Sequence, residues 1–212
     1  MIVRGITLFS AEMYMRARIL LIAVASLLCG NASAGLFGKT VLLENVPLQW
    51  KPTSELTHGL APGELIPIQF EPFQDVRTDK HAIGENREDE NKPKPVTTND
   101  DVGAFVSTHM RQLFDSAGFK TVDSNGAVTI KGEVRQFFVR ETSTYYSEVN
   151  VHLSIVDASG KTLWSGLVPG DSTRFGRSYK LENYYEELSD AIVNCVSSLL
   201  RSDDVQKALS GH

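Results

Sequence analysis

The chain has 212 residues, with 42% hydrophobic and 22% charged side chains and a formal net charge of −5. This length allows a core of ordinary size, and the acidic balance excludes a strongly basic nucleic-acid binder. The basic residues also form no stripe with interleaved aromatic residues, so we expect no nucleic-acid partner.

The first 34 residues have the pattern of an export signal. Arg16 and Arg18 precede an apolar run of about ten residues that ends at Leu28, and Ala32-Ser33-Ala34 has the small-x-small pattern that signal peptidase recognises. A membrane-spanning helix needs about 20 apolar residues, so this run is too short to anchor the chain. We expect cleavage near Ala34 and a periplasmic mature protein without a transmembrane helix.

Two alternatives stay open for this leader. Cys29 directly follows the apolar run, and its lipidation would make the protein an outer-membrane lipoprotein with peripheral membrane association. A lipoprotein signal has a small residue before the cysteine, whereas Leu28 stands here. Translation from Met13 or Met15 would give a leader of more usual length. After plain cleavage only Cys195 remains, so no internal disulfide can form.

The amino-terminal part of the mature chain should be irregular. Residues 35–63 contain three prolines and one short apolar run, and we expect an arm that adds at most an edge strand. Residues 65–75 alternate as a strand does, but Pro67 and Pro72 restrict them to a sheet edge. Residues 76–98 are dense in charge and have no period, so we expect a long charged loop.

A helix is predicted over residues 99–117, because apolar side chains recur every three or four positions and two aspartates suit its amino end. Gly118 can adopt the left-handed conformation that ends a helix. Residues 119–122 then form a short strand, and residues 123–126 form a turn.

Three strands are predicted next. Residues 127–141 switch the face of their apolar side chains near Gln136, which indicates a β-bulge. Residues 148–157 alternate most clearly, and a turn at 157–160 leads into a partner strand over residues 161–172. The inward side chains of the middle strand are Val149, Val151, Leu153 and Ile155.

An amphipathic helix over residues 181–200 follows, and its apolar stripe includes Cys195. We therefore expect this thiol to be buried and unreactive. Residues 64–209 should form a single α+β domain. Its predicted architecture is a two-layer sandwich, with a mainly antiparallel sheet of about four to five strands and two helices packed on one face.

The residues form no constellation that is typical of catalysis or metal binding. His58, His81, His109 and His152 are not spaced to place two ligands on one helix face, and Cys195 has no partner for a zinc site. The chain also lacks a Gly-x-Ser-x-Gly elbow, a phosphate-binding glycine loop and a dinucleotide fingerprint. We expect no enzymatic activity, no metal and no cofactor.

Exposed aromatic side chains beside arginine are frequent anchors of protein interfaces. Two tyrosines lie at a predicted hairpin end, and aromatic and basic residues border the last strand and the loop after it. A structural role for Trp164, covering the sheet edge under the last helix, stays open. The interaction candidates are Tyr145, Tyr146, Trp164, Arg174, Phe175 and Arg177.

Several short motifs lie between residues 64 and 209. They are Phe70-x-x-Phe73-x-Asp75-x-Arg77, Ile83-Gly84, Leu113-Phe114-x-x-Ala117-Gly118-Phe119, Gly132-x-Val134, Gly160-Lys161-x-Leu163-Trp164, Leu188-Ser189-x-Ala191 and Leu199-Leu200. Together they resemble the YajG family of bacterial envelope lipoproteins and, more loosely, the small periplasmic domains of the LpoB type. The resemblance implies an α+β envelope protein without an enzymatic site.

We expect an exported, non-catalytic accessory protein that docks to another envelope protein through a sheet edge, the 76–98 loop or the Trp164 region. The alternative is a carrier or sensor that binds a small amphipathic ligand between the helices and the sheet. Unfilled apolar volume there would favour the alternative, whereas a filled core with an exposed aromatic patch would favour docking. A hydrolase is a third hypothesis, against which the missing catalytic constellations argue.

Overall fold

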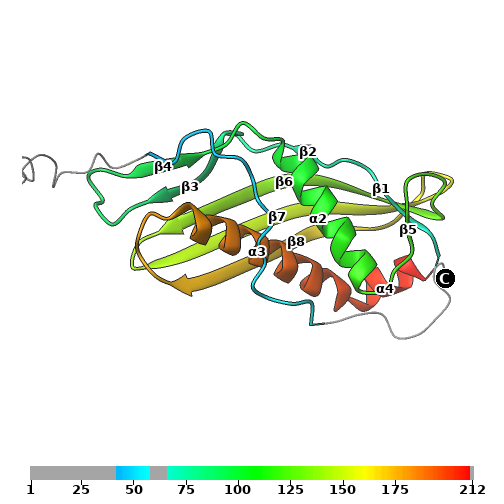
Figure 1. The fold of residues 1–212 in the computed structure, drawn as a ribbon. Coiled ribbons are helices and arrows are strands. Elements are labelled where there is room, and N and C mark those ends of the chain that lie inside the picture. Colours follow the sequence, from blue (N-terminus) through cyan, green and yellow to red (C-terminus); the bar gives the residue numbers. More distant parts are fainter. Residues whose placement is uncertain (1–41, 58–65, 211–212) are drawn as a thin grey trace, which may run out of the picture. The chain divides into compact units, whose positions relative to one another are not determined.

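A computed structural model describes residues 42–57 and 66–210 (Figure 1). The expected signal peptide and Cys29 lie outside these residues. The described part contains one eight-stranded sheet and three helices. In chain order they are β1 (Ile68–Phe70), β2 (Gln74–Asp75), β3 (Ala82–Asn86), β4 (Lys94–Thr97), α2 (Val102–Ser116), β5 (Thr121–Val122), β6 (Val128–Glu141), β7 (Thr144–Asp157), β8 (Thr162–Phe175), α3 (Leu181–Leu200) and α4 (Asp203–Leu209).

The long strand β6 organises the sheet. On one side it pairs with β7 in the antiparallel direction, and β8 continues this meander. On the other side the short strands β1, β2 and β3 pair with β6 one after another, all in the parallel direction. β5 extends the sheet beyond β1, and β4 extends it beyond β3.

The meander agrees with several sequence predictions. The pairing of β6 with β7 shifts between Val134 and Gln136, which confirms the predicted bulge. The four inward side chains predicted for β7 are all buried. β8 runs three residues further than expected, to Phe175.

The predicted architecture is wrong in the sheet and in the helix count. We expected a mainly antiparallel sheet of about four to five strands with two helices, but the described residues form a mixed sheet of eight strands with three helices. The missed strands β3 and β4 lie within residues 76–98, which we expected to be a loop. Strands of two to five residues contain too few side chains to show an alternating pattern.

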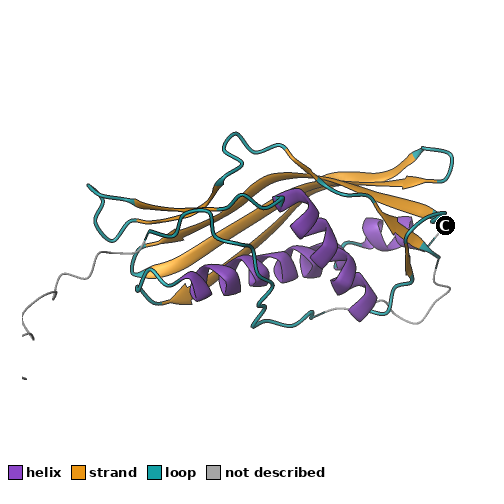
Figure 2. Ribbon diagram, turned by 45° about the horizontal axis from the view of Figure 1, so that its top comes forward, coloured by secondary structure: helices purple, strands orange, loops and turns teal. Residues whose placement is uncertain are grey.

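The helices lie on one side of the sheet (Figure 2). α3 has the bounds that the sequence predicted, and its Cys195 is fully buried, as expected. α2 begins later than expected, because the Asp101 side chain caps it by accepting a hydrogen bond from the Ala104 amide at 2.9 Å. Gly103 is needed beside this cap, since a Cβ there would lie 2.1 Å from the Phe73 carbonyl oxygen.

Arg77 closes a gap in the parallel edge of β6. Between the segments that pair with β2 and β3, the Phe137 carbonyl of β6 accepts a hydrogen bond from Arg77 Nη1 at 3.2 Å. The same guanidinium donates to the carbonyls of Lys80 and Ala82 and to both oxygens of Asp75. The Asp75-x-Arg77 motif of the sequence thus has a structural role in this fold.

Candidate interaction site

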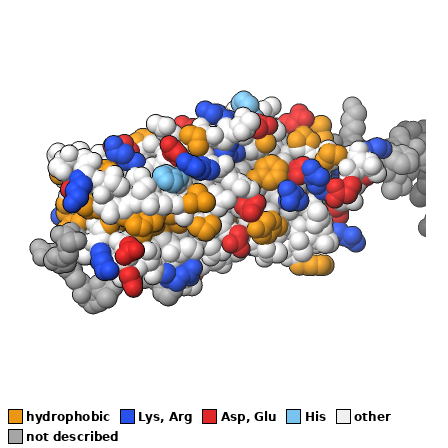
Figure 3. Space-filling view, turned by 180° about the vertical axis from the view of Figure 1, so that it is seen from behind, with side chains coloured by type: hydrophobic (Ala, Val, Ile, Leu, Met, Phe, Trp, Pro, Cys, Tyr) orange, Lys and Arg blue, Asp and Glu red, His pale blue; other side chains and the backbone are white. Residues whose placement is uncertain are grey.

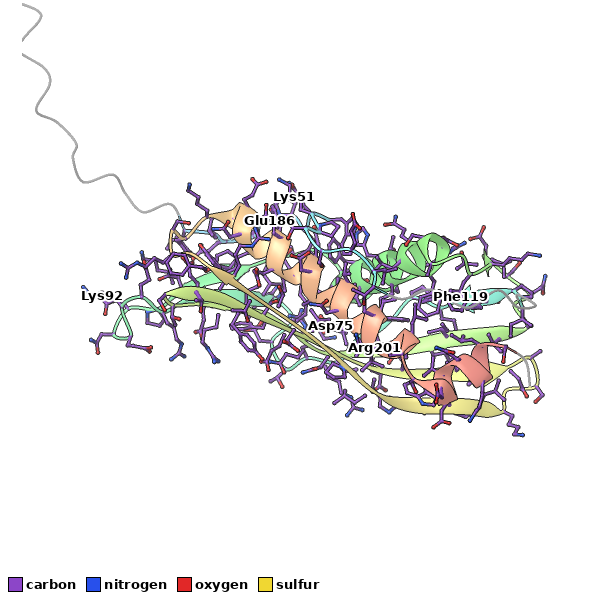
Figure 4. The ribbon with its side chains drawn as sticks, turned by 90° about the horizontal axis from the view of Figure 1, so that it is seen from below. Lys51, Asp75, Lys92, Phe119, Glu186 and Arg201 are labelled. Carbon is purple, nitrogen blue, oxygen red and sulfur yellow. The ribbon has the colours of Figure 1, made fainter. Side chains whose placement is uncertain are left out.

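One end of the domain carries the most exposed large hydrophobic side chain among residues 42–57 and 66–210. Phe175, the last residue of β8, is 87% exposed. The Arg177 side chain, two residues later, lies 3.8 Å from the Glu88 carboxylate in the turn between β3 and β4. We name the surface formed by Phe175, Arg177 and Glu88 the Phe175 end. Lys92, in the same β3–β4 turn, marks this end of the domain in Figure 4.

The loop that presents this surface is attached to the core by a buried glutamate. Oε1 of Glu141 accepts hydrogen bonds from the backbone amides of Ser178 and Tyr179 at 2.7 and 2.8 Å. Its Oε2 accepts from the Tyr184 hydroxyl at 2.7 Å. Glu141 itself is fully buried at the carboxyl end of β6. The backbone amides of the loop between β8 and α3 therefore donate to a side-chain carboxylate and not to the backbone of a neighbouring strand.

The charge of Glu141 is stabilised by these contacts. Burial alone would raise its pKa, but the hydrogen bonds from the Tyr179 amide and the Tyr184 hydroxyl lower it. Burial and the adjacent Glu141 carboxylate raise the pKa of Tyr184. The pair therefore remains a charged acceptor and a neutral donor at ordinary pH. Because both residues are fully buried, they are a structural anchor and do not meet solvent.

Tyr179 adds a second attachment for the same loop. It is a non-glycine residue with a positive φ of 46°, a conformation that is costly unless the surroundings impose it. Its hydroxyl donates to the Pro95 carbonyl of β4 at 2.8 Å and accepts from the Leu43 amide at 3.0 Å. These bonds tie the loop to β4 and to the amino-terminal segment, which restricts the motion of the neighbouring Phe175 end.

The structure separates the six interaction candidates. Tyr145 is fully buried, and its ring packs edge-on against Tyr184 at 5.4 Å between centroids. Trp164 is half-buried near the other end of β8, eleven residues before Phe175, which is about 36 Å along a strand. Tyr146 is 38% exposed and donates to Glu148. Of the six, Phe175 and Arg177 lie together at the surface.

Arg174 has a structural role on the helix side of the sheet. Its guanidinium contacts Glu186, Glu187 and Asp190 of α3. It also donates to the hydroxyl of Thr53, in the segment before β1, at 2.7 Å. Arg174 therefore joins β8, α3 and the amino-terminal segment.

The open face of the sheet is a mixed surface. Figure 3 shows hydrophobic side chains scattered among both signs of charge on this side. Leu167 and Leu163 of β8 are 56% and 38% exposed. The outer edge of β8 is partly blocked, because Pro169 has no N–H and Asn194 donates to the Asp171 carbonyl at 2.8 Å. The β8 edge is therefore a poor template for an added strand.

Sites for small molecules or metals are less well defined. A surface hollow of about 860 Å³ opens at the amino end of α2, with Asp75, Arg77 and Lys80 in its wall. Asp75 and Arg77 neutralise each other, and the rest of the wall carries Lys80 beside Asp100 and Asp101. Within the described ranges no group of His, Cys, Asp and Glu is arranged to hold a metal ion, and no helix is long and apolar enough to cross a membrane.

Comparisons with known proteins identify the fold alone. No family model and no curated protein matches the chain. Protein XCC0632 of Xanthomonas campestris, from family DUF330, is similar with a TM-score of 0.50 and 10% sequence identity, over 79% of this chain and 94% of that one.

Two further solved structures have lower scores. PelC from Paraburkholderia phytofirmans, described as a dodecamer, has a TM-score of 0.40 and 16% identity over 68% of this chain and 93% of its own. A Caulobacter crescentus protein provisionally named a lipoprotein has a TM-score of 0.37 and 14% identity over 50% of this chain and 80% of its own.

Sequence reasoning missed the buried acceptors that hold the irregular segments. Glu141 and Asp190 look like ordinary strand and helix carboxylates in the sequence, but both are buried. The only signal was that each stands among apolar positions of its element, where a carboxylate needs several donors. The sequence could not show which donors those are.

Proposed function

We propose that this protein is an exported, non-catalytic accessory protein of the bacterial cell envelope that acts by contacting another envelope protein at the Phe175 end. The observation that carries the proposal is the 87% exposure of Phe175 at the end of β8, beside a loop attached to the core by Glu141. Exposed aromatic residues beside arginine supply much of the energy in protein interfaces.

Rigidity of the loop supports this assignment. An interface aromatic contributes most when little conformational freedom is lost on binding. Burying a phenylalanine side chain contributes about 2 kcal/mol. Here Glu141 holds the backbone three and four residues after Phe175, at Ser178 and Tyr179. The ion pair of Arg177 with Glu88 supplies polar groups at the rim of the same surface.

The alternative is a carrier or sensor with an amphipathic ligand between the helices and the sheet. The apolar side chains of the described residues form one continuous buried cluster in that layer. A ligand there would have to displace packed side chains, whereas a contact at the Phe175 end needs no rearrangement. We therefore prefer protein contact.

The compartment is part of the proposal. The pattern that ends at Ala34 favours export and cleavage, and lipidation of Cys29 would add outer-membrane association. The proposed relation to YajG-like lipoproteins depends on the short motifs of the sequence. The fold shared with XCC0632 is compatible with this relation. Sequencing of the mature amino terminus tests the export step, and an unprocessed chain in the cytosol would contradict it.

Site-specific crosslinking in living cells tests the contact. A photoreactive amino acid is placed at Phe175, at Arg177 and, as a control, at Leu163 near the other end of β8. We expect the same adduct from the first two positions and none from Leu163, with adduct yield from Arg177 falling when Phe175→Ser is added. Adducts of equal yield at all three positions would show that the Phe175 end is not a specific contact.

A further inference from the structure

Residues 46–56, here named the strap, lie across α2 and α3 before the chain enters the sheet (Figures 1 and 4). At its start the Val46 amide donates to the Thr97 carbonyl at 2.8 Å. From Leu48 onward, the backbone amides of the strap donate to side chains of distant residues. This is the manner in which many proteins hold an extended peptide ligand.

The first anchor of the strap is aromatic. The indole of Trp50 stacks on the His109 ring of α2, with centroids 4.3 Å apart and planes 6° apart. Phe105 packs edge-on against the same His109 ring at 4.4 Å. Burial lowers the pKa of His109, so the ring stays neutral at ordinary pH. The side chain of Trp50 thus packs on an aromatic surface formed by His109 and Phe105 of α2.

The second anchor is a single carboxylate. Asp190 of α3 accepts hydrogen bonds from the amides of Thr53 and Ser54 at 2.6 and 2.8 Å. It also accepts from both of their hydroxyl groups, at 2.6 and 2.9 Å. The neighbouring Ser189 hydroxyl accepts from the Lys51 amide at 2.9 Å. This carboxylate therefore selects two successive hydroxyl residues in an extended backbone.

The strap does not use all the polar groups beneath it. Tyr185 lies one turn before Ser189 on the same face of α3, and its buried hydroxyl has no hydrogen-bond partner. Along the strap only Val46 is buried, while Pro47 and Pro52 are exposed. Leu48, Trp50 and Leu56 are partly buried and pack against the core. The strap is thus held by side-chain contacts and hydrogen bonds outside the sheet ladder, and one buried donor beneath it stays unpaired.

We propose that the strap-binding surface, formed by Phe105, His109, Ser189 and Asp190, is a peptide-binding site that the strap occupies in cis. Its second occupant is an extended segment of a partner protein, with an aromatic residue followed three and four positions later by Ser or Thr. This site is on a different face from the Phe175 end and does not depend on the function proposed above.

The chemistry of the surface sets the requirements for that segment. The aromatic surface of His109 and Phe105 binds an aromatic ring by stacking, and Asp190 accepts hydrogen bonds from backbone amides and hydroxyl groups. An acidic residue at the Ser or Thr positions would be repelled by Asp190. Because the strap is tethered, its effective concentration is about millimolar, so a partner segment binds well only when the strap is weakened or the partner is itself held nearby.

A peptide titration tests the site in the full exported chain. The probe is a fluorescein-labelled synthetic peptide with the sequence of residues 45–57. The strap is weakened by Trp50→Ala with Thr53→Val, and fluorescence anisotropy follows binding. We expect binding about tenfold or more tighter than to the wild-type chain. A peptide that carries the W50A change should bind about tenfold more weakly than the original.

Two controls make the result specific. Asp190→Asn in the weakened background should abolish peptide binding, whereas Leu163→Ala, on β8 away from the strap, should leave it unchanged. Circular dichroism and urea unfolding check that each variant is folded. If the folded, weakened chain binds the peptide no better than the wild type, or binds the W50A peptide equally well, the proposal is overturned.

A second measurement needs no weakened strap. The chain has two tryptophans, so Trp164→Phe leaves Trp50 as the sole reporter. A millimolar peptide in which phenylalanine replaces tryptophan should displace Trp50 from His109 and shift its emission towards that of an exposed indole. An unchanged emission spectrum at this concentration would contradict a displaceable strap. Neither measurement involves Phe175, so failure here leaves the crosslinking test of the Phe175 end intact.

Discussion

Glu141 and Asp190 perform the same task in two regions of the domain. Each is a buried carboxylate that accepts two backbone amides of an irregular segment and at least one hydroxyl group. Glu141 holds the loop after β8, which lies at the surface at one end of the sheet. Asp190 holds the strap, which covers the helices from outside and is 136 to 137 positions away in sequence.

The surroundings of the two carboxylates differ. Glu141 is fully buried against Tyr184, a core residue, so its loss disturbs the packing of α3 on β6. Asp190 is 4% exposed and faces Arg174, and its donors are on the strap. The comparison indicates that one carboxylate stabilises the domain as a whole, whereas the other controls a segment that can leave.

The largest effect is expected for Glu141→Ala. This change leaves two amides and the Tyr184 hydroxyl without an acceptor, and we expect the free energy of unfolding to fall by about 4 kcal/mol. Urea denaturation measures the loss. Glu133→Ala, at an exposed ion pair of β6, is the matched control and should change stability by less than about 0.5 kcal/mol. A similar small effect of Glu141→Ala would remove it as a core anchor.

A smaller and more local effect is expected for Asp190→Ala. Removing the acceptor of the strap should lower the free energy of unfolding by about 2 kcal/mol or less. Chymotrypsin should then cut after Trp50 or Leu48 at denaturant concentrations where the sheet is still folded. If cutting at the strap begins only with global unfolding, the strap and the core form one cooperative unit and the contrast with Glu141 fails.

Glu187 lies near Asp190 on α3, but removing its charge should raise the stability of the domain, whereas removing that of Asp190 or Glu141 should lower it. It is 1% exposed, and neither carboxylate oxygen has a hydrogen-bond partner. Burial raises its pKa despite the Arg174 guanidinium 3.3 Å away, which acts in the opposite direction. Its stabilising contribution is therefore present below its unfolded pKa of about 4.5 and is lost as pH rises through the folded value. We expect Glu187→Gln to raise stability by about 1 kcal/mol at pH 7, and the gain to vanish near pH 4.

The pH dependence of Asp190 and Glu141 provides the matching control. Burial opposes ionisation of both. Hydrogen bonds from Thr53 and Ser54 lower the pKa of Asp190, and hydrogen bonds from Tyr179 and Tyr184 lower that of Glu141. Their stabilisation is present above the unfolded values near 4 and is lost as pH falls through the folded values. The benefit of Glu187→Gln should therefore shrink over the same acid range in which the domain itself loses stability. A gain that persists at pH 4 would contradict the raised pKa of Glu187.

The smallest effect on stability is expected at Phe175. Because the side chain is 87% exposed, Phe175→Ser should change the free energy of unfolding by no more than about 0.5 kcal/mol. The same substitution should reduce crosslinking from Arg177. A large loss of stability would show that Phe175 packs on the fold, and it would then be unsuited as a free interface anchor.

The sequence predicted the long, regular elements well. The bounds of α3, the bulge near Gln136 and the inward side chains of β7 all follow from hydrophobic periods that extend over ten or more residues. The burial of Cys195 follows from its place in the α3 stripe, and burial raises the pKa of its thiol to about 12. Such patterns are local, so neighbouring residues are enough to show them.

The short strands and the irregular segments were not predictable in this way. We expected a loop where β3 and β4 lie, since strands of five and four residues are too short to show a period and they lie within a segment that is dense in charge. The direction of β1, β2 and β3 was also missed, because parallel pairing depends on β6, which comes much later in the chain. Tyr145 falls in the core because α3 places Tyr184 against it.

The sequence by itself determined the meander of long strands, the two amphipathic helices and the position of the buried thiol, because each is set by side-chain period within one segment. Only the tertiary structure decided which carboxylates become anchors, where the strap lies and which aromatic residue stays at the surface. Each of these depends on donors and acceptors between about 37 and 137 positions apart, such as Ser178 with Glu141 and Thr53 with Asp190. A buried charge is stable only where hydrogen-bond donors from distant parts of the chain surround it, and a local sequence pattern does not show which donors these are.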